Sequence, residues 1–392
     1  MQAQGMTLYV NGKIYTGSDI YENGQMLVDE DGKIIDISHE QLNSTNINVI
    51  DLRGKIVVPG FVDVHIHGGN GYEVMGGTEK DLDETSKFHA SHGTTSFLPS
   101  TAAASNDDLI RVLKNCAASF ENGVSGAELL GVHLEGPYIN EKARGAMDIE
   151  QIRLPDLTEM ERFIKASENT IRLVTLAPEI EGGLELVEYL NEQGVTVSIG
   201  HSYASYEEMK KAVEHGVRHT THHFNGMRGL HHRDPGVAGT GLMLEELTLE
   251  LIADGIHVHP AVVKFMYQAK GADKICAITD AVKSTGLLDG EYDDVQVMNG
   301  KIFLKEHPDT LAGSSLTMIN GLHNVLQYTG LPLEKVLPSF TIVPAKKANV
   351  VNRKGSIERG KDADFLILDE DFNLVSTFVK GKKVYEKRCQ PC

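Results

Sequence analysis

The sequence predicts an α/β protein, a (β/α)8 TIM-type barrel with a small β-sandwich domain formed by both termini. Two patterns lead to this prediction. In the middle of the chain, short apolar runs alternate with amphipathic stretches of about 10 to 15 residues, as expected of parallel strands joined by helices. At both ends, β-like runs flank the turn sequences Asp31-Gly32 and Lys380-Gly381, which is typical of antiparallel strands.

The N-terminal segment contains three β-like runs. Leu8–Tyr15 alternates around Asn11-Gly12, Met26–Ile37 turns at Asp31-Gly32, and Val49–Leu52 is a shorter run. Helical periodicity is absent from this segment. We therefore expect residues 1–58 to form the N-terminal part of the β-sandwich domain.

Short apolar runs in the middle of the chain predict the eight strands of the barrel. Helical stretches separate most of them, for example Thr78–His92, Asp107–Phe120, Glu181–Glu192 and Ser205–His215. The connection between the sixth and seventh strands is richer in Gly and His than in helix formers. The predicted strands are Phe61–Ile66, Thr94–Leu98, Leu129–Leu134, Ile171–Leu176, Val195–Ile199, Arg218–Thr221, Leu249–Ala253 and Ile275–Thr279.

The segment after the eighth strand changes character twice. Lys283–Thr310 is irregular, and helices are expected near Leu316–Tyr328 and Leu333–Val351. The chain then returns to β-like runs at Phe365–Leu368, Leu374–Val379 and Lys382–Glu386. We therefore assign residues 59–350 to the barrel and residues 351–392 to the C-terminal part of the β-sandwich domain.

Composition excludes several classes of function. The chain has 37 basic and 55 acidic residues and a net charge of −18, so it repels nucleic acid. No apolar run approaches the roughly 18 residues of a membrane span, and the first residues lack the regions of a signal peptide. We expect a cytoplasmic protein with neither a nucleic-acid nor a membrane partner. The terminal Cys389 and Cys392 are interpreted as part of a frayed tail rather than as a metal or redox site.

His65 and His67 end the first predicted barrel strand. Because side chains on a strand repeat every two residues, both imidazoles point the same way, into the barrel, and Val64 and Ile66 pack outward. Two neutral imidazoles that converge on one point suit a divalent transition metal.

Other strand ends carry further candidate ligands. Glu135 follows the third predicted strand, and His201 and His222 lie at the ends of the fifth and sixth. Each residue taken alone is also compatible with a helix cap or a hydrogen-bonded core histidine. Barrel enzymes place their sites at these C-terminal ends, so the joint placement favours a metal centre. Asp280 closes the eighth strand, where a carboxylate can accept a proton from an acidified water.

The motifs that contain these residues resemble the amidohydrolase superfamily, in particular its deacetylases of amino-sugar phosphates. They follow the order of that family over almost the whole chain. The motifs are Val58-Pro59-Gly60-Phe61-Val62-Asp63-Val64-His65-Ile66-His67-Gly68, His133-Leu134-Glu135-Gly136-Pro137, Gly200-His201-Ser202, Thr221-His222 through Asn225-Gly226-Met227, Asp254-Gly255-Ile256-His257, Thr279-Asp280-Ala281 and Leu311-Ala312-Gly313-Ser314.

The resemblance implies a homodimer and a divalent metal centre in which Glu135, His201 and His222 bind the principal metal and Asp280 is the catalytic acid/base. Some relatives replace these two histidines, but this sequence keeps both His65 and His67. One or two ions (Zn, Fe, Mn or Co) per subunit are therefore expected. Ile171 to Glu179 contains no lysine to bridge two metals, which makes Glu135 the natural bridging ligand.

The resemblance also implies a set of substrate-binding residues. Arg233 and His257 suit a phosphate, since a guanidinium and an N–H-donating imidazole both bind anions. This chain has Ala146 and Met147 where some relatives carry a histidine. The full set is Ala146, Met147, Asn225, Gly226, Arg233, His257, Leu311, Ala312 and Gly313.

The expected reaction is hydrolysis of the acetamide of N-acetylglucosamine 6-phosphate to glucosamine 6-phosphate and acetate, a step of amino-sugar catabolism or cell-wall sugar recycling. N-acetylgalactosamine 6-phosphate and the substrates of other amidohydrolases are alternatives. A scaffold that binds metal without catalysis is the alternative from a different class, and the intact ligand set and Asp280 argue against it. Whether Arg233 serves its own subunit or a neighbouring one stays open.

Overall fold

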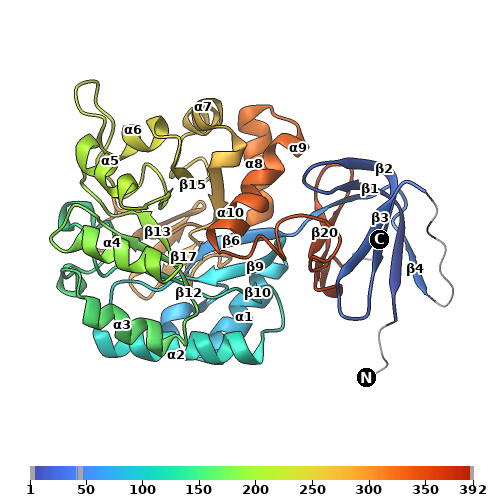
Figure 1. The fold of residues 1–392 in the computed structure, drawn as a ribbon, viewed down its shortest axis with the longest axis horizontal. Helices are drawn as coiled ribbons and strands as arrows, with labels where there is room; N and C mark the ends of the chain where they lie inside the picture. Colours follow the sequence, from blue (N-terminus) through green and yellow to red (C-terminus); the bar gives the residue numbers. More distant parts are fainter. Residues whose placement is uncertain (1–4, 41, 43–46, 389–392) are drawn as a thin grey trace.

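The computed structural model describes residues 5–40, 42 and 47–388, and it divides into a large α/β part and a smaller β part (Figure 1). The smaller part contains segments from both ends of the chain, blue and red in Figure 1, side by side. Cys389 and Cys392, and with them the predicted frayed tail, lie outside the described residues.

The strands of the large part form two parallel arcs. One arc has the order β10-β9-β6 and the other runs from β11 to β16 in chain order. Parallel bridges from Ser100 to His133 and from Ile66 to Ala281 join the arcs on both sides. The predicted barrel is confirmed, with its third strand divided in two. The strands are β6 (Phe61–Ile66), β9 (Thr94–Pro99), β10 (Glu128–Leu129), β11 (Val132–Glu135), β12 (Ile171–Leu176), β13 (Thr196–Ile199), β14 (His219–Thr220), β15 (Thr248–Ile252) and β16 (Ile275–Ile278).

The helices of the barrel begin where the sequence supplies caps. The side chains of Thr78, Ser105 and Ser205 each accept a hydrogen bond from a backbone N–H of the first turn. None of the described helices is long and apolar enough to cross a membrane. The helices are α1 (Glu79–Ala90), α2 (Asn106–Asn122), α3 (Leu157–Ala166), α4 (Gly183–Glu192), α5 (Tyr206–Glu214), α6 (Gly236–Met243), α7 (Pro260–Lys270) and α8 (Met318–Thr329).

Two predictions after the eighth strand are wrong. The stretch expected to be irregular contains an antiparallel sheet of β17 (Gly290–Tyr292), β18 (Val295–Met298) and β19 (Lys301–Leu304). The helix expected over Leu333–Val351 is divided into α9 (Leu333–Val336), a 3-10 turn (Leu337–Phe340) and α10 (Ile342–Lys347). Pro338 and Pro344 lie in these pieces, and proline removes the backbone donor that a continuous helix needs.

β6 does not keep the regular alternation assumed from the sequence. Its pairing with β9 shifts register between Asp63 and Ile66, so the strand is irregular over Val64 and His65. Val64 shares a hydrophobic cluster with Leu98 and Ile278, whereas Ile66 belongs to a different cluster. The expectation that both residues pack on one outer face is therefore wrong.

Both chain ends share one mixed sheet, as predicted, because β20 pairs antiparallel with β5. The ring of Tyr9 packs edge-on against Phe365 at 5.1 Å and Phe378 at 5.7 Å, so faces of this folded sheet meet in a core. Asn11-Gly12 forms no turn but lies at a register shift inside β1. The strands are β1 (Thr7–Tyr15), β2 (Ile20–Val28), β3 (Ile34–Ser38), β4 (Asn48–Asp51), β5 (Ile56–Pro59), β20 (Phe365–Leu368), β21 (Leu374–Val379) and β22 (Lys382–Glu386).

A buried ion-pair network ties the barrel to the C-terminal segment. The side chain of Lys354 is 1% exposed, and its Nζ lies 2.5 Å from Glu128 of β10 and 2.5 Å from Asp364. Asp362 lies 2.9 Å from the same nitrogen. A buried charge with several partners holds its elements in one arrangement, since removing one partner leaves the others unpaired. The predicted domain limits at residues 58 and 350 stay predictions.

Candidate metal centre and substrate cavity

The predicted metal ligands and Asp280 gather at the C-terminal ends of the barrel strands. His65 lies within β6, and His67 follows it. Glu135 ends β11, and His201, His222 and Asp280 come two residues after β13, β14 and β16. Since all these ends open on one side of a parallel barrel, side chains far apart in sequence meet at its mouth.

Three of these residues adopt a left-handed backbone conformation. The φ angles are 48° at His201, 29° at His222 and 52° at Asp280. Non-glycine residues adopt such angles only where the surrounding structure holds them, and such residues cluster at functional sites. Backbone hydrogen bonds supply the restraint, because the N–H of Asp280 donates to His65 O at 3.0 Å and that of His222 donates to Glu250 at 2.8 Å.

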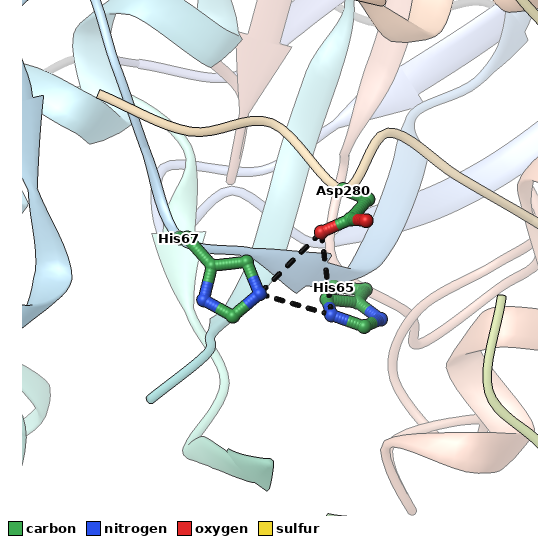
Figure 2. Close-up of side chains that lie close together, drawn as sticks. All are labelled: His65, His67 and Asp280. Carbon is green, nitrogen blue, oxygen red and sulfur yellow. Dashed lines mark hydrogen bonds and ion pairs between the residues drawn. The ribbon is translucent and has the colours of Figure 1, made fainter. Parts of the chain in front are cut away.

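His65, His67 and Asp280 form one cluster of candidate ligands (Figure 2). The Nε2 atoms of the two histidines are 3.1 Å apart. Asp280 Oδ1 lies 3.5 Å from Nε2 of His65 and 3.4 Å from that of His67. One nitrogen from each ring and one carboxylate oxygen thus face a common point.

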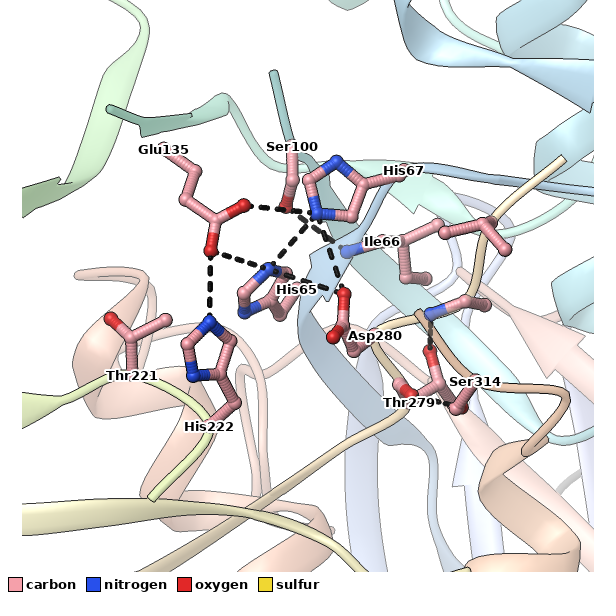
Figure 3. A network of polar contacts seen from close by, with 12 residues as sticks. His65, Ile66, His67, Ser100, Glu135, Thr221, His222, Thr279, Asp280 and Ser314 are labelled. Atoms are coloured by element: carbon pink, nitrogen blue, oxygen red, sulfur yellow. Dashed lines mark hydrogen bonds and ion pairs between the residues drawn. The ribbon is translucent and has the colours of Figure 1, made fainter. Parts of the chain in front are cut away.

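Glu135, His201 and His222 form a second, buried cluster. Glu135 Oε1 is 3.3 Å from His201 Nε2 and 3.2 Å from His222 Nε2, and these two nitrogens are 3.0 Å apart. The other oxygen of Glu135 lies 3.2 Å from His67 Nε2. Glu135 therefore stands between the two clusters, with His67 on one side and His222 on the other (Figure 3).

The Nδ1 nitrogens of the two rings in the second cluster are hydrogen-bonded to backbone carbonyls. Nδ1 of His201 bonds Ala143 O at 2.8 Å, and Nδ1 of His222 bonds Asn225 O at 3.0 Å. A carbonyl only accepts, so each ring carries its proton on Nδ1 and turns Nε2 toward Glu135 and the other ring. Two nitrogen lone pairs and a carboxylate this close together suit a divalent cation. The residues present therefore fit a metal ion.

The charges around the clusters point to the same conclusion. Burial alone would lower the pKa of His65, but the carboxylates of Glu135, Asp280 and Glu250 raise it well above its usual range. Burial alone would raise the pKa of Glu135, but the neighbouring imidazoles hold it well below its usual range. The carboxylates thus make the site a buried, negatively charged environment. A positive charge stabilises such an environment, and either a proton or a metal ion can supply it.

Glu250 was missed by the sequence analysis. It lies in β15 with a fully buried side chain, and its carboxylate contacts His65, His219 and the backbone N–H of His222. The signal was a single acidic residue inside the apolar run 247–253. Glutamate is almost never fully buried unless it is paired, so such a position indicates a buried partner.

A cavity of about 920 Å³ opens over the two clusters. Its walls include Glu135, His201, His222, Asp280 and His67. It also brings together most of the predicted substrate residues. These are Ala146, Met147, Asn225, Gly226, His257, Leu311, Ala312 and Gly313.

The loop from Leu311 to Ser314 is hydrogen-bonded to the residues that follow the eighth barrel strand. The N–H of Ser314 donates to Asp280 O at 2.9 Å, and its hydroxyl donates to Thr279 O at 2.5 Å (Figure 3). A Cβ on Gly313 would stand 2.2 Å from Val282 Cγ1, so only glycine fits this approach. The loop backbone therefore holds a fixed position beside Asp280.

His257 is oriented by Asp254, a residue to which the sequence analysis assigned no role. Asp254 Oδ2 lies 2.6 Å from His257 Nδ1, and Oδ1 accepts the backbone N–H groups of Ile256 and His257 at 2.8 Å each. The carboxylate accepts a hydrogen bond from Nδ1–H, so Nε2 is left as the group that can reach a ligand.

Arg233 does not join the other predicted substrate residues. It is exposed, lies at the tip of a turn bridged by His231 and Asp234, and is not among the described residues that line the cavity. Its Nη1 lies 2.8 Å from His232 Nε2. Within one chain, the expected contribution of Arg233 to the cavity is therefore absent.

The amidohydrolase family matches residues 56–384 of this chain. Together with the barrel and its ligand clusters, this match shows that the chain belongs to the amidohydrolase family. The resemblance expected from the motifs is confirmed.

More particular relatives are N-acetylglucosamine-6-phosphate deacetylases. The enzyme of that name from Vibrio furnissii is 36% identical over 381 residues, which cover 97% of this chain and 95% of that protein. An N-acetylgalactosamine-6-phosphate deacetylase from Escherichia coli O157:H7 is 34% identical over 340 residues, 86% of this chain and 89% of that protein.

A solved structure supports the same relationship. It is an aspartate-to-alanine mutant of N-acetyl-D-glucosamine-6-phosphate deacetylase from Mycobacterium smegmatis in complex with N-acetyl-D-glucosamine-6-phosphate. The TM-score is 0.90 at 29% identity, over 97% of this chain and 99% of that chain.

Proposed function

We propose that this protein hydrolyses the acetamide of N-acetyl-D-glucosamine 6-phosphate to D-glucosamine 6-phosphate and acetate, with the help of a divalent metal. The observation that carries the proposal is one cavity that holds both ligand clusters, Asp280 and His257. The deacetylase relatives supply the substrate class. The reaction would belong to amino-sugar catabolism or cell-wall sugar recycling.

Glu135, His201 and His222 would hold the principal metal, and His65 and His67 would hold a second, with Glu135 shared between the sites. Zn, Fe, Mn and Co all accept imidazole and carboxylate ligands, so one or two such ions per subunit fit this set. When bound, a divalent ion supplies Lewis acidity, which makes water more acidic and polarises an amide carbonyl.

Asp280 would transfer the protons of the reaction. Burial raises the pKa of its carboxyl group, but His65, His67 and His222 outweigh burial and lower it, so the group is ionised at neutral pH. As a carboxylate it can accept the proton of the attacking water. The neutral acid can then donate that proton to the departing amine nitrogen, which must leave protonated.

His257 would bind the phosphate at the far end of the substrate, together with the backbone of Asn225 and Gly226. Because Nδ1–H donates to Asp254, the ring is held so that a proton on Nε2 can be donated to a phosphate oxygen. The loop Leu311–Gly313 would line the sugar. Binding at the phosphate, away from the reacting bond, orients the acetamide against Asp280.

Arg233 does not line the cavity of its own chain. It would therefore complete a phosphate site only in another copy of the chain. We therefore retain the homodimer as a proposal, with the loop at Arg233 donated to the neighbouring subunit. A sugar phosphate is a charged metabolite that does not cross a lipid bilayer unaided, so this substrate implies a cytoplasmic enzyme.

N-acetylgalactosamine 6-phosphate is the second candidate substrate. It is favoured by the 34% identity to the deacetylase from E. coli O157:H7 that is named for that sugar. The two sugars are epimers that differ only in the configuration of one hydroxyl group. Both carry the phosphate and the acetamide at the same positions of the ring.

The proposal is tested by acetate release from four compounds under identical conditions. These are N-acetylglucosamine 6-phosphate, its galactosamine epimer, unphosphorylated N-acetylglucosamine and an unrelated cyclic amide. We expect kcat/KM to be highest for the phosphorylated glucosamine by at least about tenfold. A preference for the epimer would select the second candidate, and turnover of only the cyclic amide would contradict both.

A further inference from the structure

Among the described residues, Glu250 is the one buried carboxylate outside the two candidate ligand clusters that contacts both of them. It lies in β15, which pairs with β14 and β16, yet its side chain reaches His65 of β6 past the intervening strand. Its exposed fraction is 0%. Carboxylates this deeply buried require partners for both oxygens.

Three donors satisfy the carboxylate. Oε2 lies 3.0 Å from His65 Nδ1 and 2.8 Å from the backbone N of His222. Oε1 lies 3.1 Å from His219 Nε2. Since a carboxylate only accepts, His65 carries its proton on Nδ1, and its Nε2 lone pair faces His67 and Asp280.

His65 differs in this respect from the histidines of the second cluster. His201 and His222 direct Nδ1 at backbone carbonyls, which no substitution removes. His65 directs Nδ1 at a charged side chain. A carboxylate behind a ligating imidazole fixes its orientation and increases its basicity as a metal ligand.

We propose that Glu250 is the positioning residue of the His65 cluster: its carboxylate fixes the His65 ring so that Nε2 is free for metal, and thereby determines whether the second metal site fills. Glu250 itself is not among the residues that line the cavity. Its contact to a ligand ring is to His65, and its contact to the second cluster is to the backbone N–H of His222. This inference rests on the metal centre of the proposed function and adds the group that controls its second ion.

The test measures metal binding rather than turnover. The wild-type chain and Glu250→Gln are stripped of metal and titrated with Co²⁺, following the visible absorption and the metal-to-protein ratio. Gln keeps the volume of Glu and one accepting oxygen, which can still bond the N–H groups of His65 and His222, so this variant preserves the packing and removes the negative charge beside the His65 ring. We expect two equivalents in the wild type, and a loss of about tenfold to 100-fold in affinity at one of them in Glu250→Gln. The other equivalent should change less than about threefold.

Three further variants separate positioning from a general effect on stability. Glu159→Gln removes a buried carboxylate that bonds Tyr138 and Arg153 but touches neither cluster, and it should bind both equivalents normally. His65→Gln removes the ligand itself. If Glu250 acts through His65, adding Glu250→Gln to His65→Gln should leave the affinity of the remaining equivalent within about threefold.

Three results would overturn the inference. Unchanged affinities in Glu250→Gln would show that the carboxylate does not control the site. An equal loss in Glu159→Gln, or a further loss in the double variant, would show a general structural effect. A single equivalent in the wild type would remove the second site, while the proposed deacetylase would survive if that one equivalent supports acetate release.

Discussion

The carboxylate of Asp280 lies 3.4 Å from Nε2 of His67, at the point where the ligand clusters meet the cavity. This distance places the proposed proton carrier beside the candidate metal ligands and on the side open to substrate. Replacing Asp280 by Asn keeps the shape of the side chain and removes its ability to accept a proton.

We expect Asp280→Asn to reduce kcat by about 10³-fold or more, while metal bound by Glu135, His201 and His222 stays near the wild-type amount. Steady-state kinetics and elemental analysis on the same preparation measure both quantities. Asp309→Asn, in the wall of the same cavity but outside the clusters, is the matched control and should retain kcat within about threefold. Substantial turnover by Asp280→Asn would remove Asp280 from the mechanism.

Asp254→Asn should weaken phosphate recognition without affecting the chemistry. The Asn carbonyl can still accept the N–H groups of Ile256 and His257, but its amide group now faces His257 Nδ1. That amide cannot accept the hydrogen bond of Nδ1–H, so the ring loses the contact that orients it toward the phosphate. We expect KM for the phosphorylated substrate to rise by about tenfold and kcat to stay within about threefold. Unphosphorylated N-acetylglucosamine serves as the internal control, and an equal rise in its KM would contradict the role of Asp254.

Lys354→Met should destabilise the fold by about 3 to 5 kcal/mol, because it leaves the buried carboxylate of Asp364 without its cation, whereas Glu128 and Asp362 keep Arg353. Urea unfolding measures the free energy of unfolding. Lys383→Met, which removes an exposed lysine paired with Glu386, should change it by less than about 0.5 kcal/mol. Similar values for the two variants would mean that the buried network adds little to stability.

His89 makes stability depend on pH. Burial lowers its pKa to about 4, while Nε2 donates to Gly68 O at 2.9 Å. The unfolded chain takes up a proton near pH 6.5 and the folded chain does not, so this contribution is full above pH 6.5 and falls as the pH drops toward 4. Between pH 7 and pH 5 it amounts to about 2 kcal/mol.

The variant His89→Gln isolates that contribution. Its free energy of unfolding should fall less than that of the wild type between pH 7 and pH 5, by about 2 kcal/mol. His307→Gln, which replaces an exposed histidine, is the control and should follow the wild type. Parallel curves for His89→Gln and the wild type would show that His89 is not the group responsible.

Much of the fold could be predicted because the barrel repeats one local pattern. Phe61–Ile66 and Ile171–Leu176 are apolar runs followed by turns, and the strands have those limits. The sheet of β17 to β19 could not be predicted, since its short strands lie among charged residues such as Asp293 and Asp294. The division of the helix at Pro338 and Pro344 could have been predicted from those prolines alone.

The candidate site was predictable where a residue lies at a strand end. His201 and Asp280 come two residues after their strands, and the barrel architecture brings such positions together. Glu250 and Asp254 hydrogen-bond to His65 and His257, and these contacts could not be predicted from the sequence because they depend on how the side chains are oriented in the fold. Arg233 has the right chemistry for phosphate, but its loop carries it away from the cavity of its own chain.

The most direct test of the proposed activity is acetate release from N-acetylglucosamine 6-phosphate by one preparation in three states: as purified, stripped of metal, and restored with Zn²⁺ or Co²⁺. The ligand clusters predict that stripping abolishes turnover and that restoring metal recovers it. Full turnover in protein shown to contain no metal would contradict the metal centre. Absence of turnover in protein shown to hold metal would contradict the proposed substrate.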